Sequence, residues 1–285
     1  MQPAPAYDPD WNEIWKERQR RQESTKLAGD PSHNWDKKEN AERYDANARS
    51  KYDDRVQRTI ASLPLSRDAR VLDIGAGPGI LALPLAPLVR DVTAVEPGAG
   101  MVEVLKKHAE REGIRNIACV QKTWEEVDPA HDLSPPYDLV IASLSLTMHD
   151  IREALVKMDA ACSGSVHIFW FADMPFWERM NADLWMPLHG RPYYPGPKAD
   201  CLFGVLYQMG IYADVTMMPM GKEYRFPSSE EMLAFFCQRF GATTQAQKKT
   251  IEDYIAPMIR AVGHEVVISG ISTLAHIRWN KHQSE

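Results

Sequence analysis

Three glycines stand where an apolar run of the sequence ends and a helical pattern begins. The run covers residues 71–74, and Gly75, Gly77 and Gly79 follow it at alternate positions. Because glycine has no Cβ, the backbone there can adopt positive φ angles and let a ligand lie close to the main chain. The free N–H groups at the start of the following helix, from Ile80 onward, then face an anionic group. The stretch predicts a strand, a ligand-binding turn and a helix.

The spacing of these glycines separates two kinds of nucleotide site. A dinucleotide fingerprint reads G-x-G-x-x-G, whereas Ile80 stands where that pattern has its third glycine. The string VLDIGAGPG instead resembles motif I of the class I S-adenosylmethionine (SAM)-dependent methyltransferases. The resemblance implies SAM as the cofactor and S-adenosylhomocysteine (SAH) as the product. It also implies that the motif supplies these cofactor-binding residues: Asp73, Gly75, Ala76, Gly77 and Gly79.

Further cofactor ligands are expected at the carboxyl ends of the neighbouring strands, where open parallel sheets bind their ligands. Glu96 ends the second strand, and its two oxygens can accept hydrogen bonds from both ribose hydroxyls. Family members often carry an Asp for the adenine amino group where this chain has Thr123. Here the Thr123 hydroxyl, the Trp124 ring and the Glu125 carboxylate are the expected substitutes. The remaining expected cofactor contacts are Tyr44, Pro97, Met101 and Ser143.

A histidine follows the fourth strand, in the loop that is expected beside the sulfonium group. His149 is the natural candidate for a general base, because its unperturbed pKa lies near neutrality. A structural or solvent-exposed histidine is the alternative. Methyl transfer needs little acid–base help, since the sulfonium is a good leaving group and alignment of the reacting atoms supplies much of the acceleration.

Short apolar runs and helical stretches alternate from Arg70 to Phe171, which is typical of βαβ units in a largely parallel sheet. The expected strands cover residues 71–74, 91–95, 117–120, 138–143 and 165–171, with helices over 80–88, 101–112 and 151–161. Beyond residue 198, helices are expected over 200–210, 229–240 and 246–261, and strands over 215–220 and 274–279. The resemblance implies an α/β fold with a doubly wound, mostly parallel sheet of seven strands. Residues 1–63, with helical patterns from Trp11 and over 35–63, form an expected N-terminal lid on a core of residues 64–285.

An aromatic, proline-rich segment over residues 174–198 interrupts this pattern after the fifth strand, and it is expected to be irregular. It is the candidate cap of the acceptor site, suited to an apolar or aromatic small molecule. Its aromatic side chains could equally pack against the core or against a second subunit of a homodimer. The candidate acceptor-binding residues are Trp170, Trp177, His189, Tyr193 and Tyr194.

The composition limits the classes of partner. A chain of 285 residues with 44% hydrophobic residues can bury a large core, and its net charge of −6 does not favour nucleic acid. The four cysteines contain no C-x-x-C pair, so no metal site is expected. The sequence shows neither a secretory leader nor a membrane span, which predicts a cytoplasmic protein without a membrane partner.

These observations predict a SAM-dependent methyltransferase that acts on a small molecule, with the acceptor atom (O, N, S or C) left open. Three alternatives remain. A non-catalytic SAM-binding or scaffold protein would use the same glycines, an NAD-dependent oxidoreductase is disfavoured by Ile80, and a nucleic-acid methyltransferase is disfavoured by the acidic charge.

Overall fold

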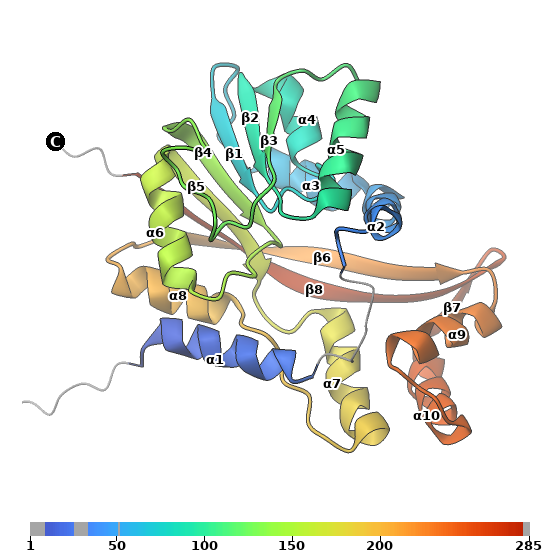
Figure 1. The fold of residues 1–285 in the computed structure, drawn as a ribbon. Helices are drawn as coiled ribbons and strands as arrows, with labels where there is room; N and C mark the ends of the chain where they lie inside the picture. The colour runs from blue at the N-terminus through green and yellow to red at the C-terminus, as the bar shows by residue number, and fades with distance from the viewer. Residues whose placement is uncertain (1–8, 26–33, 51, 282–285) are drawn as a thin grey trace, which may run out of the picture.

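One mixed sheet forms the centre of the chain in the computed structural model, which describes residues 9–25, 34–50 and 52–281 (Figure 1). The strand order is β3-β2-β1-β4-β5-β8-β6, and β7 pairs with β8 as an eighth strand. The parallel strands are β1 (Arg70–Ile74), β2 (Asp91–Val95), β3 (Ile117–Val120), β4 (Tyr137–Ser143) and β5 (Cys162–Phe171). The antiparallel strands are β6 (Asp214–Phe226), β7 (Ile259–Val262) and β8 (Glu265–Asn280). The predicted doubly wound α/β sheet is confirmed, and β7 adds to it.

Helices cover both faces of the parallel strands, because successive residues of each strand point to opposite faces and both sets are apolar. On one face, Leu72 and Ile74 belong to a core with Trp15, Met158 and Leu202. On the other face, the core includes Val71 of β1 and Leu139 and Ile141 of β4. The first layer contains α1 (Trp11–Glu23), α6 (Ile151–Ala161) and α8 (Ala199–Gln208). The second contains α3 (Tyr52–Ala61), α4 (Ala82–Leu85), the 3₁₀ turn η2 (Ala86–Leu88) and α5 (Ala99–Arg111), against which α2 (Lys38–Ser50) packs.

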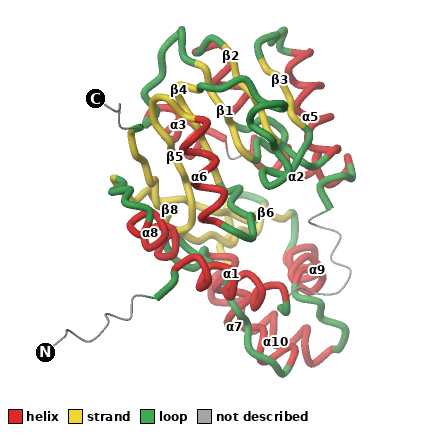
Figure 2. Tube along the Cα trace, turned by 60° about the vertical axis from the view of Figure 1, so that its left-hand side comes forward, coloured by secondary structure: helices red, strands yellow, loops and turns green. Residues whose placement is uncertain are grey.

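A smaller unit, which we call the cap, stands beside the carboxyl ends of the parallel strands. It consists of α7 (Phe176–His189), α9 (Ser229–Arg239), α10 (Gln245–Ile255), the 3₁₀ turn η3 (Ala256–Met258), β7, and the paired ends of β6 and β8 that reach beyond the core. Its own apolar core includes Met180, Leu184, Phe236 and Ile268. Figure 2 shows α7, α9 and α10 gathered below the sheet. Because β5 runs directly into α7, the cap lies where the parallel strands end.

Several predicted boundaries need correction. The segment 174–198 is not irregular throughout, since α7 occupies half of it and continues through Pro187 to a left-handed Gly190. The last two strands are much longer than predicted, with 13 residues in β6 and 16 in β8. The expected helix 246–261 divides into α10, η3 and β7. The expected helix 35–63 comprises α2 and α3, and Lys51 between them lies outside the described residues.

None of the helices in the described parts of the chain combines the length and the apolar character that crossing a membrane requires.

Candidate active site

The turn after β1 contains three glycines with positive φ, of +71° at Gly75, +56° at Gly77 and +83° at Gly79. Their surroundings differ. A Cβ at Gly75 would lie 2.3 Å from the Ser145 Cβ, and one at Gly79 would lie 2.9 Å from the Leu83 side chain. A Cβ at Gly77 would meet nothing within 4 Å. Gly75 and Gly79 therefore allow the turn to pack, whereas Gly77 leaves open space beside its main chain.

Glu96 connects this turn to the next one. Its side chain is buried at the end of β2, where Oε2 accepts a hydrogen bond from the Gly77 N–H and Oε1 accepts one from the Gly98 N–H, both at 2.9 Å. Burial raises the pKa of the Glu96 carboxyl, and the two N–H donors partly oppose that shift. The carboxylate is thus fixed at the edge of the sheet beside the glycine turn.

Asp73 lies deeper in the same site. Its side chain is only 2% exposed, and Oδ2 has no hydrogen-bond partner in the described structure. The Ala82 N–H donates the hydrogen bond that the carboxyl group does receive. Burial, followed by the nearby Glu96 charge, raises the pKa of Asp73 to about 7. An unpartnered buried oxygen is costly unless a ligand or water satisfies it, so Asp73 marks a binding position.

Asp73 and the first part of the glycine turn line one pocket, and Glu96 lies beside it through its hydrogen bond to Gly77. Six predicted residues lie along it, namely Tyr44, Asp73, Gly75, Ala76, Gly77 and Ser143. Five lining residues were not predicted, namely Arg55, Pro78, Ile80, Leu81 and Leu144. Pro78 and Ile80 follow directly from the turn, and Leu144, with φ of +57°, is where the chain bends away after β4.

Arg55 is the most consequential lining residue that the sequence did not reveal. It comes from α3, and its Nη1 donates to the Ser143 Oγ at 3.4 Å. Burial lowers the pKa of the Arg55 guanidinium, although an arginine remains charged in proteins. In an amphipathic helix such a residue cannot be distinguished from an ordinary solvated arginine, so only the tertiary structure identifies it.

The segment before α2 lies directly on the turn that follows Glu96. The Ala99 N–H donates to Asp36 Oδ1 at 3.2 Å, and the rings of Trp35 and Tyr44 meet edge to face at 5.4 Å. A Cβ at Gly98 would lie 2.8 Å from the Trp35 Cβ, and one at Gly100 would lie 2.8 Å from the Trp35 carbonyl oxygen. The two glycines therefore make room for this segment over the Glu96 side of the pocket.

The residues predicted at the end of β3 do not line the pocket. The Thr123 hydroxyl donates to Glu126 at 2.9 Å. Trp124 is 3% exposed and its Nε1 donates to the Ala154 carbonyl in α6, so this predicted adenine contact occupies a core position. Glu125 is exposed and accepts a hydrogen bond from the main chain of His149. Four further predicted contacts are also outside the pocket lining. Pro97 is exposed, Met101 is buried beneath α2, Gly79 packs against Leu83, and Glu96 lies beside the pocket.

His149 is likewise absent from the pocket lining. Beyond Leu144 the loop enters the opposite core, where Leu146 and Met148 are buried, and the Met148 carbonyl accepts from the Trp15 Nε1 at 2.9 Å. This anchoring leaves His149 exposed on the side of α1 and α6. The predicted general base is therefore not positioned at the pocket.

The predicted acceptor-binding aromatic residues are spread over the junction of α1, α7 and the core. The Trp170 indole N–H donates to the Pro197 carbonyl, and its ring faces Trp15 of α1 at 6.2 Å. Trp177 meets Phe171, at the end of β5, edge to face at 5.4 Å. The other three make contacts with the cap or α1: His189 with Trp185, Tyr193 with Glu178, and Tyr194 with Arg21. Of the five, Trp170 lies in β5 itself and Trp177 is joined by ring contact to the end of that strand.

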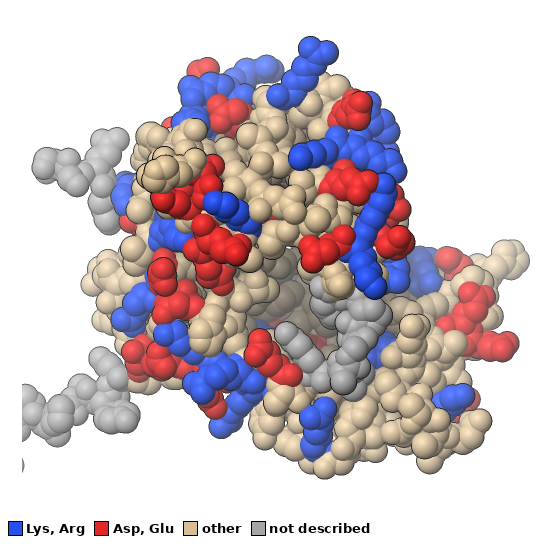
Figure 3. All heavy atoms as spheres, in the orientation of Figure 1, with Lys and Arg blue, Asp and Glu red and all other residues tan. Residues whose placement is uncertain are grey.

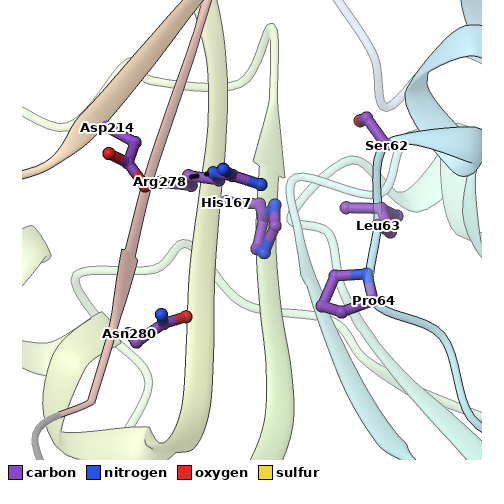
Figure 4. A pocket seen from close by; sticks show the side chains of 7 residues that line it. All are labelled: Ser62, Leu63, Pro64, His167, Asp214, Arg278 and Asn280. Atoms are coloured by element: carbon purple, nitrogen blue, oxygen red, sulfur yellow. Dashed lines mark ion pairs between the residues drawn. The ribbon is translucent and has the colours of Figure 1, made fainter.

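The surface is hollowed between the core and the cap, below the carboxyl ends of the strands (Figure 3). A separate cavity of about 290 Å³ lies at the opposite edge, between the residues after α3 and the strands β5, β6 and β8 (Figure 4). It contains the Asp214–Arg278 ion pair, with N and O 3.4 Å apart, and the buried His167. Because it lies at the other edge of the sheet, this cavity is not part of the site at the glycine turn. No cluster of three or more metal-binding side chains is present in the described parts of the chain.

Comparison with known proteins defines the class of this site. Residues 71–167, which include the glycine turn and Glu96, match the family model for a methyltransferase domain. A crystal structure from Bacillus halodurans, reported as that of a candidate methyltransferase, has a TM-score of 0.55 and 15% identity, covering 80% of this chain and 99% of that one. The chain therefore contains a methyltransferase domain over the matched residues, and its fold is the class I, Rossmann-like fold of SAM-dependent methyltransferases.

Two curated relatives show how far the similarity extends. An uncharacterized protein of Haemophilus influenzae is 26% identical over 251 residues, which cover 88% of this chain and 90% of that protein. A ubiquinone biosynthesis O-methyltransferase of Azorhizobium caulinodans is 37% identical over 81 residues, which cover 28% of this chain and 30% of that protein. Similarity to a relative of named activity is thus limited to part of the core.

Proposed function

We propose that the chain transfers the methyl group of SAM to a small-molecule acceptor that binds between the carboxyl edge of the sheet and the cap. The observation that carries this proposal is the position of the cap, which stands beside the edge that contains the cofactor pocket. The net charge of −6 supports a small molecule over a nucleic acid. The family match ends at residue 167, before the cap begins, so the acceptor has to be identified experimentally.

The pocket residues, together with Glu96 beside them, fit the parts of SAM. Glu96 would accept hydrogen bonds from the ribose hydroxyls, and the open main chain at Gly77 would let the cofactor approach closely. Asp73, with its unpartnered oxygen, would receive the ammonium group of the amino-acid part. Arg55, on the same pocket, would pair with its carboxylate. A buried anion and a half-buried cation in one pocket match an amino acid, which carries both charges.

When bound, SAM supplies an electrophilic methyl group on a sulfonium that leaves as SAH. The residues of this chain hold the ribose and the amino-acid part so that the methyl faces the acceptor, and this alignment is a principal source of rate acceleration. Since His149 is not at the pocket, the proposal assigns no general base among the predicted residues. The acceptor would therefore present a nucleophile that is already unprotonated.

Isothermal titration calorimetry with SAH, and with NADH as the comparison ligand, tests the cofactor assignment. SAH binding at micromolar concentration without NADH binding is the expected result. Binding of NADH without binding of SAH would mean that the glycine turn is a dinucleotide-binding turn and would contradict the SAM assignment. Formation of SAH from SAM, measured with small-molecule extracts and separately with total RNA, then tests the acceptor class, and SAH formation that requires RNA would contradict the small-molecule proposal.

Glu96→Ala is expected to weaken SAM and SAH binding alike, by roughly tenfold or more, because both ligands carry the same ribose and lose a charged acceptor. Glu96→Gln retains one acceptor oxygen and the side-chain volume, so its loss should be smaller. Calorimetry with SAM and with SAH checks that Glu96→Ala loses more affinity than Glu96→Gln. Unchanged SAH affinity in a folded Glu96→Ala variant would remove Glu96 from the ribose site.

A non-catalytic SAM-binding protein is the second candidate, and the absence of His149 from the pocket lining is the observation that favours it. It predicts SAH binding without SAM turnover for any acceptor. The SAH-formation assay distinguishes the two, because an extract that supports turnover excludes the non-catalytic protein.

A further inference from the structure

The cofactor pocket contains a carboxyl group, that of Asp73, whose charged and protonated forms are both poorly stabilised by the surrounding protein. Asp73 is 2% exposed, so burial disfavours its charged form, while Oδ2 has no partner that would stabilise a proton or a charge. The second carboxylate of the site, Glu96, adds repulsion from the end of β2. Only the Ala82 N–H, at the start of α4, favours the charged form of Asp73.

The other charged or titratable groups of the pocket come from the remaining elements that surround it. Tyr44 comes from α2 and Arg55 from α3, while β4 and the turn after it contribute the uncharged Ser143 and Leu144. Neither Tyr44 nor Arg55 is among the groups that shift Asp73. Without a ligand, then, nothing in the described lining compensates a negative charge on Asp73 apart from one main-chain N–H.

We propose that Asp73 holds a proton in a substantial fraction of the cofactor-free protein and releases it to solvent when the cationic amino-acid end of SAM or SAH binds. The carboxyl O–H bond breaks, its electron pair stays on the oxygen, and the carboxylate then pairs with the ligand's ammonium group. The inference rests on the proposed cofactor site, and it adds that cofactor affinity depends on pH. The pKa of about 7 for Asp73 is consistent with it.

The direction of this dependence follows from linkage. A cation that binds only the carboxylate competes with the proton, so affinity is lower wherever Asp73 is protonated. Between about pH 8 and about pH 6, a group that titrates near pH 7 lowers the affinity about tenfold. Above about pH 8 the affinity should level off, because the proton is already gone.

The experiment is calorimetry of SAH binding at about pH 6, 7 and 8, repeated in buffers with different ionisation enthalpies to count the protons released. At about pH 7 we expect about half a proton per SAH bound, and an affinity about tenfold lower at about pH 6 than at about pH 8. Asp73→Asn should abolish the release and flatten the affinity profile. Glu96→Gln serves as the matched control and should retain a smaller release, since Glu96 is only the second cause of the shift.

The outcomes separate this inference from the proposed function. SAH binding with no proton release and equal affinity at each pH overturns the role of Asp73 and leaves the cofactor assignment intact. Loss of the release in Glu96→Gln assigns the proton to Glu96 and also overturns it. If Asp73→Asn does not fold, the wild type and Glu96→Gln together still decide the question. A wild type that binds no SAH at any pH refutes the proposed function itself.

Discussion

Gly77 is the residue at which a single side chain should separate cofactor binding from folding. A valine there would occupy the open space beside the turn, and its positive φ would add strain of about 1–2 kcal/mol. Gly77→Val is expected to reduce SAH affinity at least a hundredfold in calorimetry. Wild-type affinity in a folded variant would contradict the assignment of the pocket.

Gly113 provides the matched control, because it follows α5 with φ of +69° and a Cβ there would also meet nothing within 4 Å. Gly113→Val should therefore suffer similar backbone strain and retain SAH binding. Equal losses of binding in the two variants would mean that strain, and not the filled pocket, causes the effect.

Two buried histidines, one on each of the paired strands β5 and β8, predict a pH-dependent stability. His167 Nδ1 lies 2.9 Å from His276 Nε2, and the His276 ring stacks on Phe169. Burial first, and then the neighbouring positive groups, lower the pKa of His167 to about 3 and that of His276 to about 4. Below about pH 6.5 the unfolded chain takes up protons that the folded chain does not, so stability present at neutral pH is lost as the pH falls.

Urea unfolding at about pH 7 and about pH 5 measures the net change, to which the histidines contribute a loss on the order of 1–3 kcal/mol and Asp73, with its raised pKa, a change in the opposite direction. In His276→Gln the loss should be smaller, since one of the two histidines is absent. An identical loss in the variant would place the pH dependence on other groups.

Single positions were predictable from sequence only where the local chain determines their role. The glycines and Glu96 follow directly from strands with a clear apolar pattern, so their location at one edge could be inferred. The roles of Trp124 and His149 depend on how α6 and α1 pack, which is determined by residues far away in the chain. Arg55 was missed for the same reason.

The packing of α2 against α5 predicts how a substitution in α5 affects the position of α2. A Cβ at Gly100 would lie 2.8–2.9 Å from main-chain atoms of Trp35, Lys37 and Lys38, which cannot rotate away as a side chain could. In Gly100→Ala, the higher helix propensity of alanine stabilises α5 by up to about 1 kcal/mol. Overpacking against α2 destabilises the protein by about 1–3 kcal/mol, so the net effect is destabilising. We expect the start of α2 to shift and SAH affinity to fall several-fold in calorimetry.

Gly221 in β6 supplies the comparison, because an added Cβ there meets nothing within 4 Å. Gly221→Ala should leave SAH affinity unchanged. If Gly100→Ala also binds like the wild type, the contact between α2 and α5 does not support the cofactor site.

The βαβ elements were predictable because strand and helix periods alternate clearly between residues 70 and 171. The elements of the cap were not. The proline-rich composition of residues 174–198 suggested an irregular segment where α7 forms, and the predicted strand 215–220 covers only part of β6, which is held along its length by pairing with β8. Strand pairing between distant segments leaves little trace in the local sequence.

The packing inside the cap predicts that the cap can be perturbed without affecting the cofactor. The Phe176 ring, at the start of α7, lies on Gly270 of β8, where a Cβ would be 2.1 Å from the ring. Gly270→Ala should cost about 1–3 kcal/mol in thermal unfolding through overpacking, with SAH affinity unchanged. Loss of SAH binding in this variant would show that cap and cofactor site are coupled.

The double variant identifies the cause of the destabilisation. Phe176→Ala removes the ring that the new methyl group would meet, so adding Gly270→Ala to it should cost little more. Additive losses would mean that the strain at Gly270 lies elsewhere than in its contact with Phe176.

The continuity of β6 and β8 has a consequence for how ligands enter and leave. Both strands pass from the core into the cap within one unbroken antiparallel ladder, so a swinging cap would have to break main-chain hydrogen bonds. No loop connects the two units along these strands to serve as a hinge. The segment over α5, in contrast, is held mainly by side chains and by the absence of Cβ atoms at two glycines. We therefore expect two separate entrances, with SAM and SAH exchanging beneath α2 while the acceptor arrives through a fixed opening beside the cap.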